Sequence, residues 1–115
     1  MKKEIFIGYA RISKTSQNIE RQIENLNKYN ENIIIFQEAF SSKTLERTEF
    51  IKMLKLAEKE LSKNNKVNIV FDSVSRMSRD EIEGSKQYFE LEEKGIDLIF
   101  LKEPHINTET YRKAL

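Results

Sequence analysis

The sequence has no cysteine and a single histidine, His105, in 115 residues. The absence of cysteine excludes a disulfide framework, a thiolate metal site and a cysteine nucleophile. With one histidine and scattered carboxylates the chain offers no metal cluster, and an acyl-transfer serine would need a histidine base. Only three glycines and one proline are present, which leaves no obvious linker between domains.

Long apolar runs are also missing. The first three residues are basic, but the apolar residues after them are too few for a signal-peptide core, and no stretch approaches a membrane span. The composition, 38% hydrophobic and 34% charged, is that of one globular domain and fits a reducing cytoplasm. The net charge of +1 predicts no nucleic-acid partner by itself, so any basic surface must be local.

Four short apolar runs predict buried strands, at residues 5–10, 33–36, 67–71 and 96–101. Apolar residues at helical spacing fill the first two gaps, at residues 19–29 and 50–61. A capping box at residues 78–81 opens a third helix, and Gly95 suits the residue after its end. The order βαβαβαβ predicts an α/β fold with three layers, αβα, around a mainly parallel sheet. The expected strand order is 2-1-3-4, the arrangement in which the first and third strands are neighbours.

Two segments rich in serine and arginine follow predicted strands. Residues 9–13 read Tyr-Ala-Arg-Ile-Ser and close the first strand, whereas residues 75–80 read Ser-Arg-Met-Ser-Arg-Asp and follow the third. If these two strands are neighbours, both segments open onto one crevice at the carboxyl ends of the sheet. Several guanidinium groups around one serine would stabilise charge on phosphate oxygens and lower the pKa of the hydroxyl. The pattern therefore favours chemistry on a phosphodiester.

These motifs and the order of the elements resemble the catalytic domain of the serine recombinases, the resolvase/invertase family, over residues 4–104. The resemblance implies a phosphoryl transfer that uses no metal or other cofactor. In that family a serine attacks the scissile phosphate of double-stranded DNA, which leaves a 5′-phosphoserine link and a free 3′-hydroxyl. The ends are exchanged within a tetramer and rejoined. The residues do not specify the DNA site, or whether the outcome is resolution, inversion, integration or transposition.

The resemblance also assigns roles to individual residues. Ser13 matches the nucleophile. The active-site arginines are matched by Arg11, Arg76 and Arg79. Supporting or phosphate-binding positions are matched by Tyr9, Gln22, Glu38, Ser41, Arg47 and Ser75. Ser75 is a departure, because the family usually has an aspartate there that orients the neighbouring arginine. Arg76 would then need another acceptor, for which Glu38 and Asp72 are candidates.

The resemblance further implies regions beyond this domain. Residues 1–104 are expected to form the catalytic domain, and residues 105–115 to begin a helix or linker toward a dimerising helix and a separate DNA-binding region. The full-length protein would act on DNA as dimers that assemble into tetramers. Residues 1–115 alone, with a net charge of +1, are expected to bind duplex DNA weakly and to cut it poorly or not at all.

Two other functions stay open at this point. A doubly wound domain could be a receiver-like or nucleotide-binding switch, for which Asp72 is the one acceptor candidate after the third strand. It could also be a recombinase-like domain that has lost activity and serves assembly, and Ser75 is the hint of it. Single residues have simpler interpretations too: Ser13 as a turn or cap residue, Arg47 as the partner of a neighbouring glutamate, and Tyr9 as a packing residue.

Overall fold

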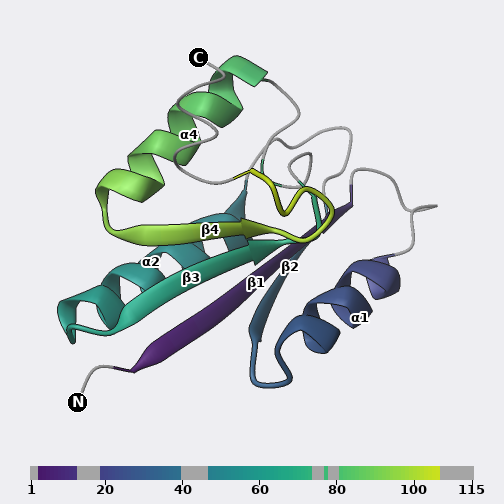
Figure 1. The fold of residues 1–115 in the computed structure, drawn as a ribbon, viewed down its shortest axis with the longest axis horizontal. Coiled ribbons are helices and arrows are strands. Elements are labelled where there is room, and N and C mark those ends of the chain that lie inside the picture. The colour runs from purple at the N-terminus through teal and green to yellow at the C-terminus, as the bar shows by residue number, and fades with distance from the viewer. Residues whose placement is uncertain (1–2, 13–18, 40–46, 74–76, 78–80, 107–115) are drawn as a thin grey trace.

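The computed structural model of the protein describes residues 3–12, 19–39, 47–73, 77 and 81–106. Within them, one sheet is formed by β1 (Glu4–Ile12), β2 (Ile34–Ala39), β3 (Lys66–Phe71) and β4 (Ile96–Phe100). Neighbouring strands are parallel, and their order across the sheet is β2-β1-β3-β4 (Figure 1). The predicted α/β fold with strand order 2-1-3-4 is confirmed.

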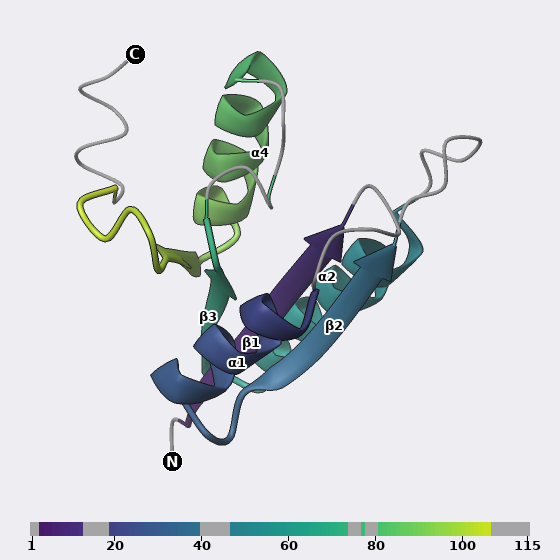
Figure 2. The same cartoon turned by 90° about the vertical axis from the view of Figure 1, so that its right-hand side faces the viewer.

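Helices cover both faces of this sheet: α1 (Ile19–Tyr29), α2 (Thr48–Ser62) and α4 (Glu81–Glu93). Leu26 of α1 packs on the face that carries Ala10 and Val70. Met53 of α2 and Tyr88 of α4 belong to one larger core on the opposite face. Figures 1 and 2 show α1 and α2 on opposite sides of β1. The three layers αβα are therefore as predicted.

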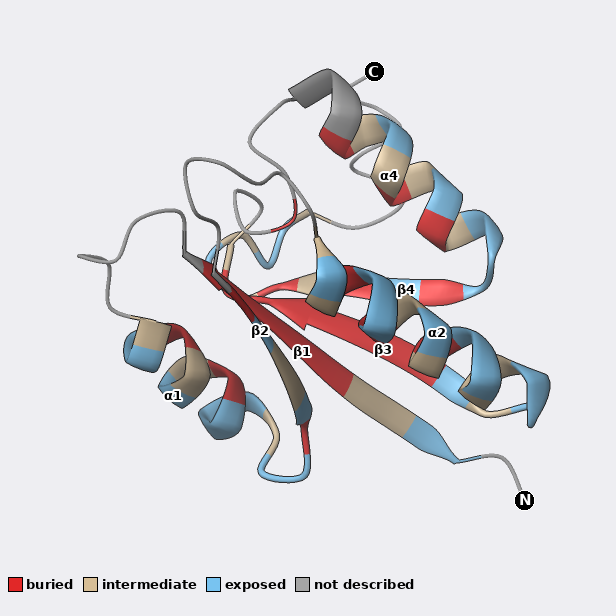
Figure 3. Ribbon diagram, turned by 180° about the vertical axis from the view of Figure 1, so that it is seen from behind, coloured by how far each residue is buried: buried red, intermediate tan, exposed pale blue. Residues whose placement is uncertain are grey.

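Side chains of β1 alternate between the two cores. Ile7 and Tyr9 belong to the core under α2 and α4, whereas Ala10 belongs to the core under α1. Gly8 allows a close approach on the α1 side, where an added Cβ would lie 3.0 Å from Cδ1 of Ile33. The middle of β1 is therefore covered on both faces, as the band of buried strands in Figure 3 shows. This explains why its sequence is continuously apolar.

Two strands extend beyond the apolar runs that predicted them. β1 continues through Arg11 to Ile12. β2 continues past Phe36 to Ala39. The parallel ladder between these strands places Arg11 opposite Glu38. Pairing thus brings charged residues into the sheet at its carboxyl edge, although neither residue fits an apolar strand pattern.

The helix ends largely agree with their sequence signals. Gly95 follows α4 with φ 91°, the conformation predicted for it, and Asn64 takes φ 64° after α2. The predicted cap Ser78 lies outside the described residues. Tyr29, which the helical spacing placed on the buried face of α1, is instead 44% exposed. It is the last helical residue, and its ring packs edge-on against Phe6. Among the described residues, no helix combines the length and the apolar character needed to cross a bilayer.

Candidate active site

Arg11 is the penultimate residue of β1 and is only 7% exposed. Its main chain is held by the side-chain amide of Gln22 in α1. The Arg11 N–H donates to Gln22 Oε1 (3.0 Å), and Gln22 Nε2 donates to the Arg11 carbonyl oxygen (2.9 Å). These two bonds fix the end of β1, two residues before Ser13.

Glu38 reaches from β2 to the amino end of α2 and is 5% exposed. Its Oε1 accepts hydrogen bonds from the Tyr9 hydroxyl (2.9 Å) and the Phe50 N–H (3.1 Å). Its Oε2 accepts from the Glu49 N–H (3.1 Å). Arg47, at the N-cap position, makes no capping bond with its side chain. The first turn of α2 is thus capped by a carboxylate from a strand, a location that the helix dipole favours for negative charge.

The guanidinium group of Arg47 lies over the ring of Phe50, with Cζ 3.9 Å from the ring centroid. Its Nη2 donates to the carbonyl oxygen of Met77 (2.8 Å), and its Nη1 donates to Oε1 of Gln87 (3.3 Å). Its Nε is buried and has no hydrogen-bond partner among the described residues. Arg47 therefore joins the start of α2 to α4 and to the main chain inside the arginine motif of residues 75–80.

Tyr9 is completely buried at the centre of this cluster. Its ring packs edge-on against Phe50 and Phe71, with centroid distances of 5.2 and 6.0 Å. Burial raises the pKa of the Tyr9 hydroxyl far above its ordinary value of 10.0; the nearby Arg47 guanidinium opposes this rise, and the Glu38 carboxylate adds to it. The hydroxyl is therefore held in its protonated form, as a donor to Glu38.

We expect the stability contributed by Tyr9 to disappear at high pH. The folded pKa of Tyr9 lies above the ordinary value of 10.0, so only the unfolded chain releases this proton near pH 10, and rising pH then favours unfolding. Below that pH, the free energy of unfolding of the wild type should exceed that of Tyr9→Phe by about 1 kcal/mol, the value of one hydrogen bond. This difference should shrink by up to about 1.4 kcal/mol per pH unit above about pH 10. Urea unfolding of both proteins across this range is the measurement, and a constant difference would contradict the expectation.

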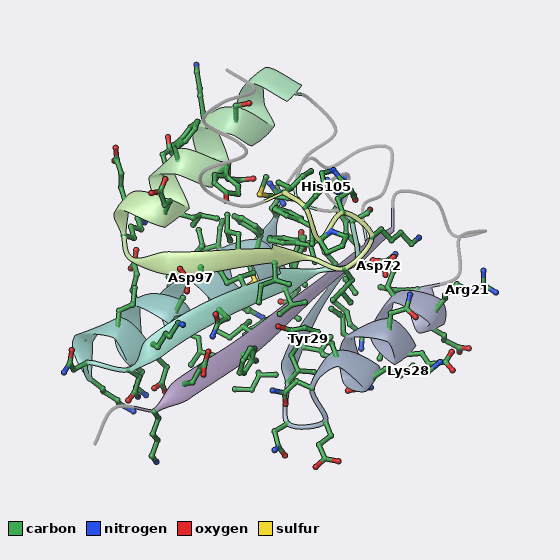
Figure 4. The ribbon with its side chains drawn as sticks, viewed as in Figure 1. Arg21, Lys28, Tyr29, Asp72, Asp97 and His105 are labelled. Atoms are coloured by element: carbon green, nitrogen blue, oxygen red, sulfur yellow. The ribbon has the colours of Figure 1, made fainter. Side chains whose placement is uncertain are left out.

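A second polar cluster lies on the α1 face, where Asp72 directly follows β3. The Asp72 carboxylate is 2% exposed, and its Oδ1 accepts a hydrogen bond from Asn25 Nδ2 (2.9 Å). Its Oδ2 is 3.2 Å from Lys102 Nζ, and its carbonyl oxygen accepts from the Lys102 N–H (2.9 Å). Figure 4 shows Asp72 at this edge of the sheet beside α1. This cluster ties α1 and the residues after β4 to the end of β3.

The structure brings together those predicted site residues that it describes. Around the ends of β1 and β2 it gathers Tyr9, Arg11, Gln22, Glu38 and Arg47. The remaining predicted site residues lie outside the described part of the chain, namely Ser13, Ser41, Ser75, Arg76 and Arg79.

Other residues join the site without having been predicted. Asn25 shares the strand-facing side of α1 with Gln22 and Leu26, and a polar pair beside a buried leucine is the signal that could have indicated it. Gln87 had no comparable signal, because its partner comes from another helix. Glu49, considered as a partner of Arg47, has its carboxylate 3.1 Å from Lys52. The described residues contain no group of three or more acidic or histidine side chains that could hold a metal ion.

The sequence and the fold are similar to those of known proteins. A family model described as Resolvase, N terminal domain, matches residues 6–115. A comparison with curated protein sequences gives no match. Among solved structures, the fold is similar to the N-terminal catalytic domain of TP901-1 integrase, with 24% identity, a TM-score of 0.66, and coverage of 93% of this chain and 82% of that chain. It is also similar to a resolvase family site-specific recombinase from Streptococcus pneumoniae, with 19% identity, a TM-score of 0.62, and coverage of 94% and 77%. Since the family model matches nearly the whole sequence, the chain belongs to the resolvase N-terminal domain family.

Proposed function

We propose that this protein is a serine recombinase catalytic domain that cuts and rejoins double-stranded DNA through Ser13. The observation that carries the proposal is the placement of Arg11, a buried arginine fixed at the end of β1, two residues before Ser13, in a chain of the resolvase family. The neighbouring strand β3 leads into the motif that contains Arg76 and Arg79. This arrangement supports one site built from both motifs.

In the proposed reaction, Ser13 Oγ attacks the phosphorus of the scissile phosphodiester. A bond forms between Oγ and phosphorus, the bond from phosphorus to the 3′-oxygen breaks, the serine loses its proton and the 3′-oxygen gains one. Three guanidinium groups, from Arg11, Arg76 and Arg79, would stabilise negative charge on the non-bridging oxygens as the phosphorus becomes five-coordinate. The reverse attack by a 3′-hydroxyl on the phosphoserine rejoins the DNA and releases Ser13.

The described neighbours take supporting roles in this proposal. Gln22 holds the main chain of Arg11, and Glu38 with Tyr9 holds the first turn of α2 against the sheet. Arg47 then joins that turn to the main chain at Met77. A phosphate-contacting role for Ser41 and Ser75 rests on their positions in the motifs alone.

The proposed partners are duplex DNA and further copies of the protein, because strand exchange requires several cut ends to be held in one assembly. Residues 1–115 alone would bind DNA weakly, since 19 acidic residues nearly balance the 20 lysines and arginines and would repel the phosphates. A cytoplasmic location would give access to the DNA. Membership of the resolvase family gives no support to the receiver-like alternative.

The proposal is tested by trapping the protein on DNA and locating the covalent link. The protein, with any sequence that follows residue 115 in its natural form, is incubated with a duplex selected by binding from a pool of sequences. A nick near the cleavage point lets the released end diffuse away, so rejoining is blocked. Nuclease and trypsin digestion followed by mass spectrometry then identifies the modified peptide.

We expect the nucleotide adduct on the tryptic peptide of residues 12–14, which contains Ser13, and none on the peptide of residues 15–21, which contains Ser16. The separation of these serines by Lys14 makes the assignment unambiguous. A link to any other residue would assign a different nucleophile. Tight binding of DNA without any adduct would instead support the inactive, assembly-serving alternative.

A further inference from the structure

Helix α1 carries two side-chain amides that reach the strands it covers. Gln22 makes two hydrogen bonds with the main chain of Arg11 in β1 (3.0 and 2.9 Å). Asn25 donates to the carboxylate of Asp72, directly after β3 (2.9 Å). The two amides are three residues apart and therefore lie about one helical turn from each other on the same face. We call Gln22 and Asn25 the amide bracket.

The amide bracket connects two adjacent strands at the point where their own pairing has ended. The ladder between β1 and β3 has its last pair at Tyr9 and Phe71. Arg11 and Asp72 lie beyond that pair, so the ladder does not fix their separation. Helix α1 links them instead, because its side chains form hydrogen bonds with both Arg11 and Asp72.

Asp72 is held in place by several contacts. Both of its carboxylate oxygens have partners, since Asn25 donates to Oδ1 and Lys102 Nζ lies 3.2 Å from Oδ2. Its carbonyl oxygen also accepts the Lys102 N–H. A buried carboxylate is costly to move away from such partners. By bonding to this carboxylate, Asn25 restrains the position of Asp72, which lies four residues before Arg76 in the sequence.

We propose that Asn25 is a positioning residue for DNA cleavage, which through Asp72 sets the distance between the two strand ends, at Arg11 and Asp72, from which the chain continues to Ser13 and to the arginine motif of residues 75–80. This inference rests on the proposed function of Ser13 and extends it to α1. Phosphoryl transfer depends on the alignment of the attacking oxygen with the groups that bind the phosphate. Loss of the bracket would let the two strand ends shift relative to each other, which lowers the rate of cleavage but leaves the remaining contacts with DNA intact.

The first test compares Asn25→Ala with the matched control Asn27→Ala. Both replace an asparagine of α1 with alanine, which favours helix, but the Asn27 side chain is exposed. In single-turnover cleavage at saturating DNA, Asn25→Ala should lower the rate constant by about 10- to 100-fold, while its apparent Kd for DNA stays within about twofold. Asn27→Ala should match wild type in both. A residue that served only folding would alter the melting temperature and not the rate of the folded protein, so an unchanged rate would overturn the proposal.

The second test requires no cleavage. Amide hydrogen exchange is measured for the same proteins at the end of β1, at the end of β3 and at the start of β1 (Glu4–Ile7). In Asn25→Ala, exchange should rise by about tenfold or more at both strand ends and stay unchanged at Glu4–Ile7. The rise at Arg11 is diagnostic, because the hydrogen bond that Asn25→Ala removes goes to Asp72, at the other strand end. Exchange that rises only around Asp72 would show that the two ends are not coupled.

The two tests separate this inference from the proposed function. A wild-type protein that forms no Ser13 adduct would contradict the proposed function, and the exchange experiment would still decide whether α1 couples the strand ends. A wild-type protein that forms the adduct, together with an Asn25→Ala variant of unchanged rate and unchanged exchange, would overturn the role of Asn25 alone.

Discussion

Replacing Ser13 with alanine is expected to abolish the covalent protein–DNA adduct and to lower DNA cleavage by on the order of 10⁴-fold or more. The substitution removes the oxygen that would form the bond to phosphorus, and the chain has no cysteine that could replace it. The arginines that would bind the phosphate are retained, so affinity for DNA should change by less than about twofold. Denaturing electrophoresis of the trapped complex measures the adduct, and fluorescence anisotropy measures the affinity.

Ser16→Ala is the matched control for this substitution. It removes the same group three residues further along the chain, and it should leave adduct formation at the wild-type level. Equal losses in the two variants would point to a general disturbance of this segment. An adduct that persists in Ser13→Ala would mean that another residue is the nucleophile. A melting temperature that falls in Ser13→Ala would mean that Ser13 has a structural role.

The central strands of the sheet could be predicted from sequence because β3 and the middle of β1 are covered on both faces. Burial on both faces favours a nearly continuous apolar run, as from Val67 to Phe71, where every residue is buried and Asn68 is the one polar residue. Loop lengths and the fixed handedness of parallel crossovers then leave few possible strand orders. Hydrophobic pattern and chain connectivity therefore predict a parallel α/β sheet, and 2-1-3-4 is one of the few strand orders that remain.

The carboxyl ends of the strands could not be predicted in this way. Arg11 and Glu38 belong to strands because they lie opposite each other in the ladder, and no local apolar pattern marks them. The bond between Asn25 and Asp72 joins positions that are 47 residues apart in sequence, so it follows only from the packing of α1 on the sheet. Polar contacts of this kind depend on tertiary geometry, which a local sequence pattern does not contain.

Ser75 stands where the family usually has an aspartate, so Arg76 would need another carboxylate as its acceptor. Glu38 and Asp72 were the two alternative acceptors considered for Arg76. Glu38 already accepts hydrogen bonds from Tyr9 and from the first turn of α2, and Asp72 already pairs with Asn25 and Lys102. Both carboxylates are therefore committed to holding secondary-structure elements together, on opposite faces of the sheet.

Replacing Glu38 with alanine is expected to destabilise the fold by about 2–4 kcal/mol. The change leaves three donors without their acceptor: the Tyr9 hydroxyl and the N–H groups of Glu49 and Phe50. These donors are partly or fully buried, so water replaces the carboxylate only incompletely. For a domain of this size the melting temperature should fall by roughly 10 °C. Glu38→Gln should cost less, about 1–2 kcal/mol, because the amide oxygen still accepts while the NH2 group faces a donor.

The matched control is Glu31→Ala, which removes an exposed glutamate from the turn between α1 and β2 and should change stability by no more than about 0.5 kcal/mol. Urea and thermal unfolding of the three variants give the comparison. The expected order of loss is Glu38→Ala, then Glu38→Gln, then Glu31→Ala, because it follows the number of acceptor sites removed from buried donors. A Glu38→Ala protein as stable as the Glu31→Ala control would mean that α2 begins at the same place without its cap from β2. The carboxylate would then be retained for the chemistry at the strand ends and not for the fold.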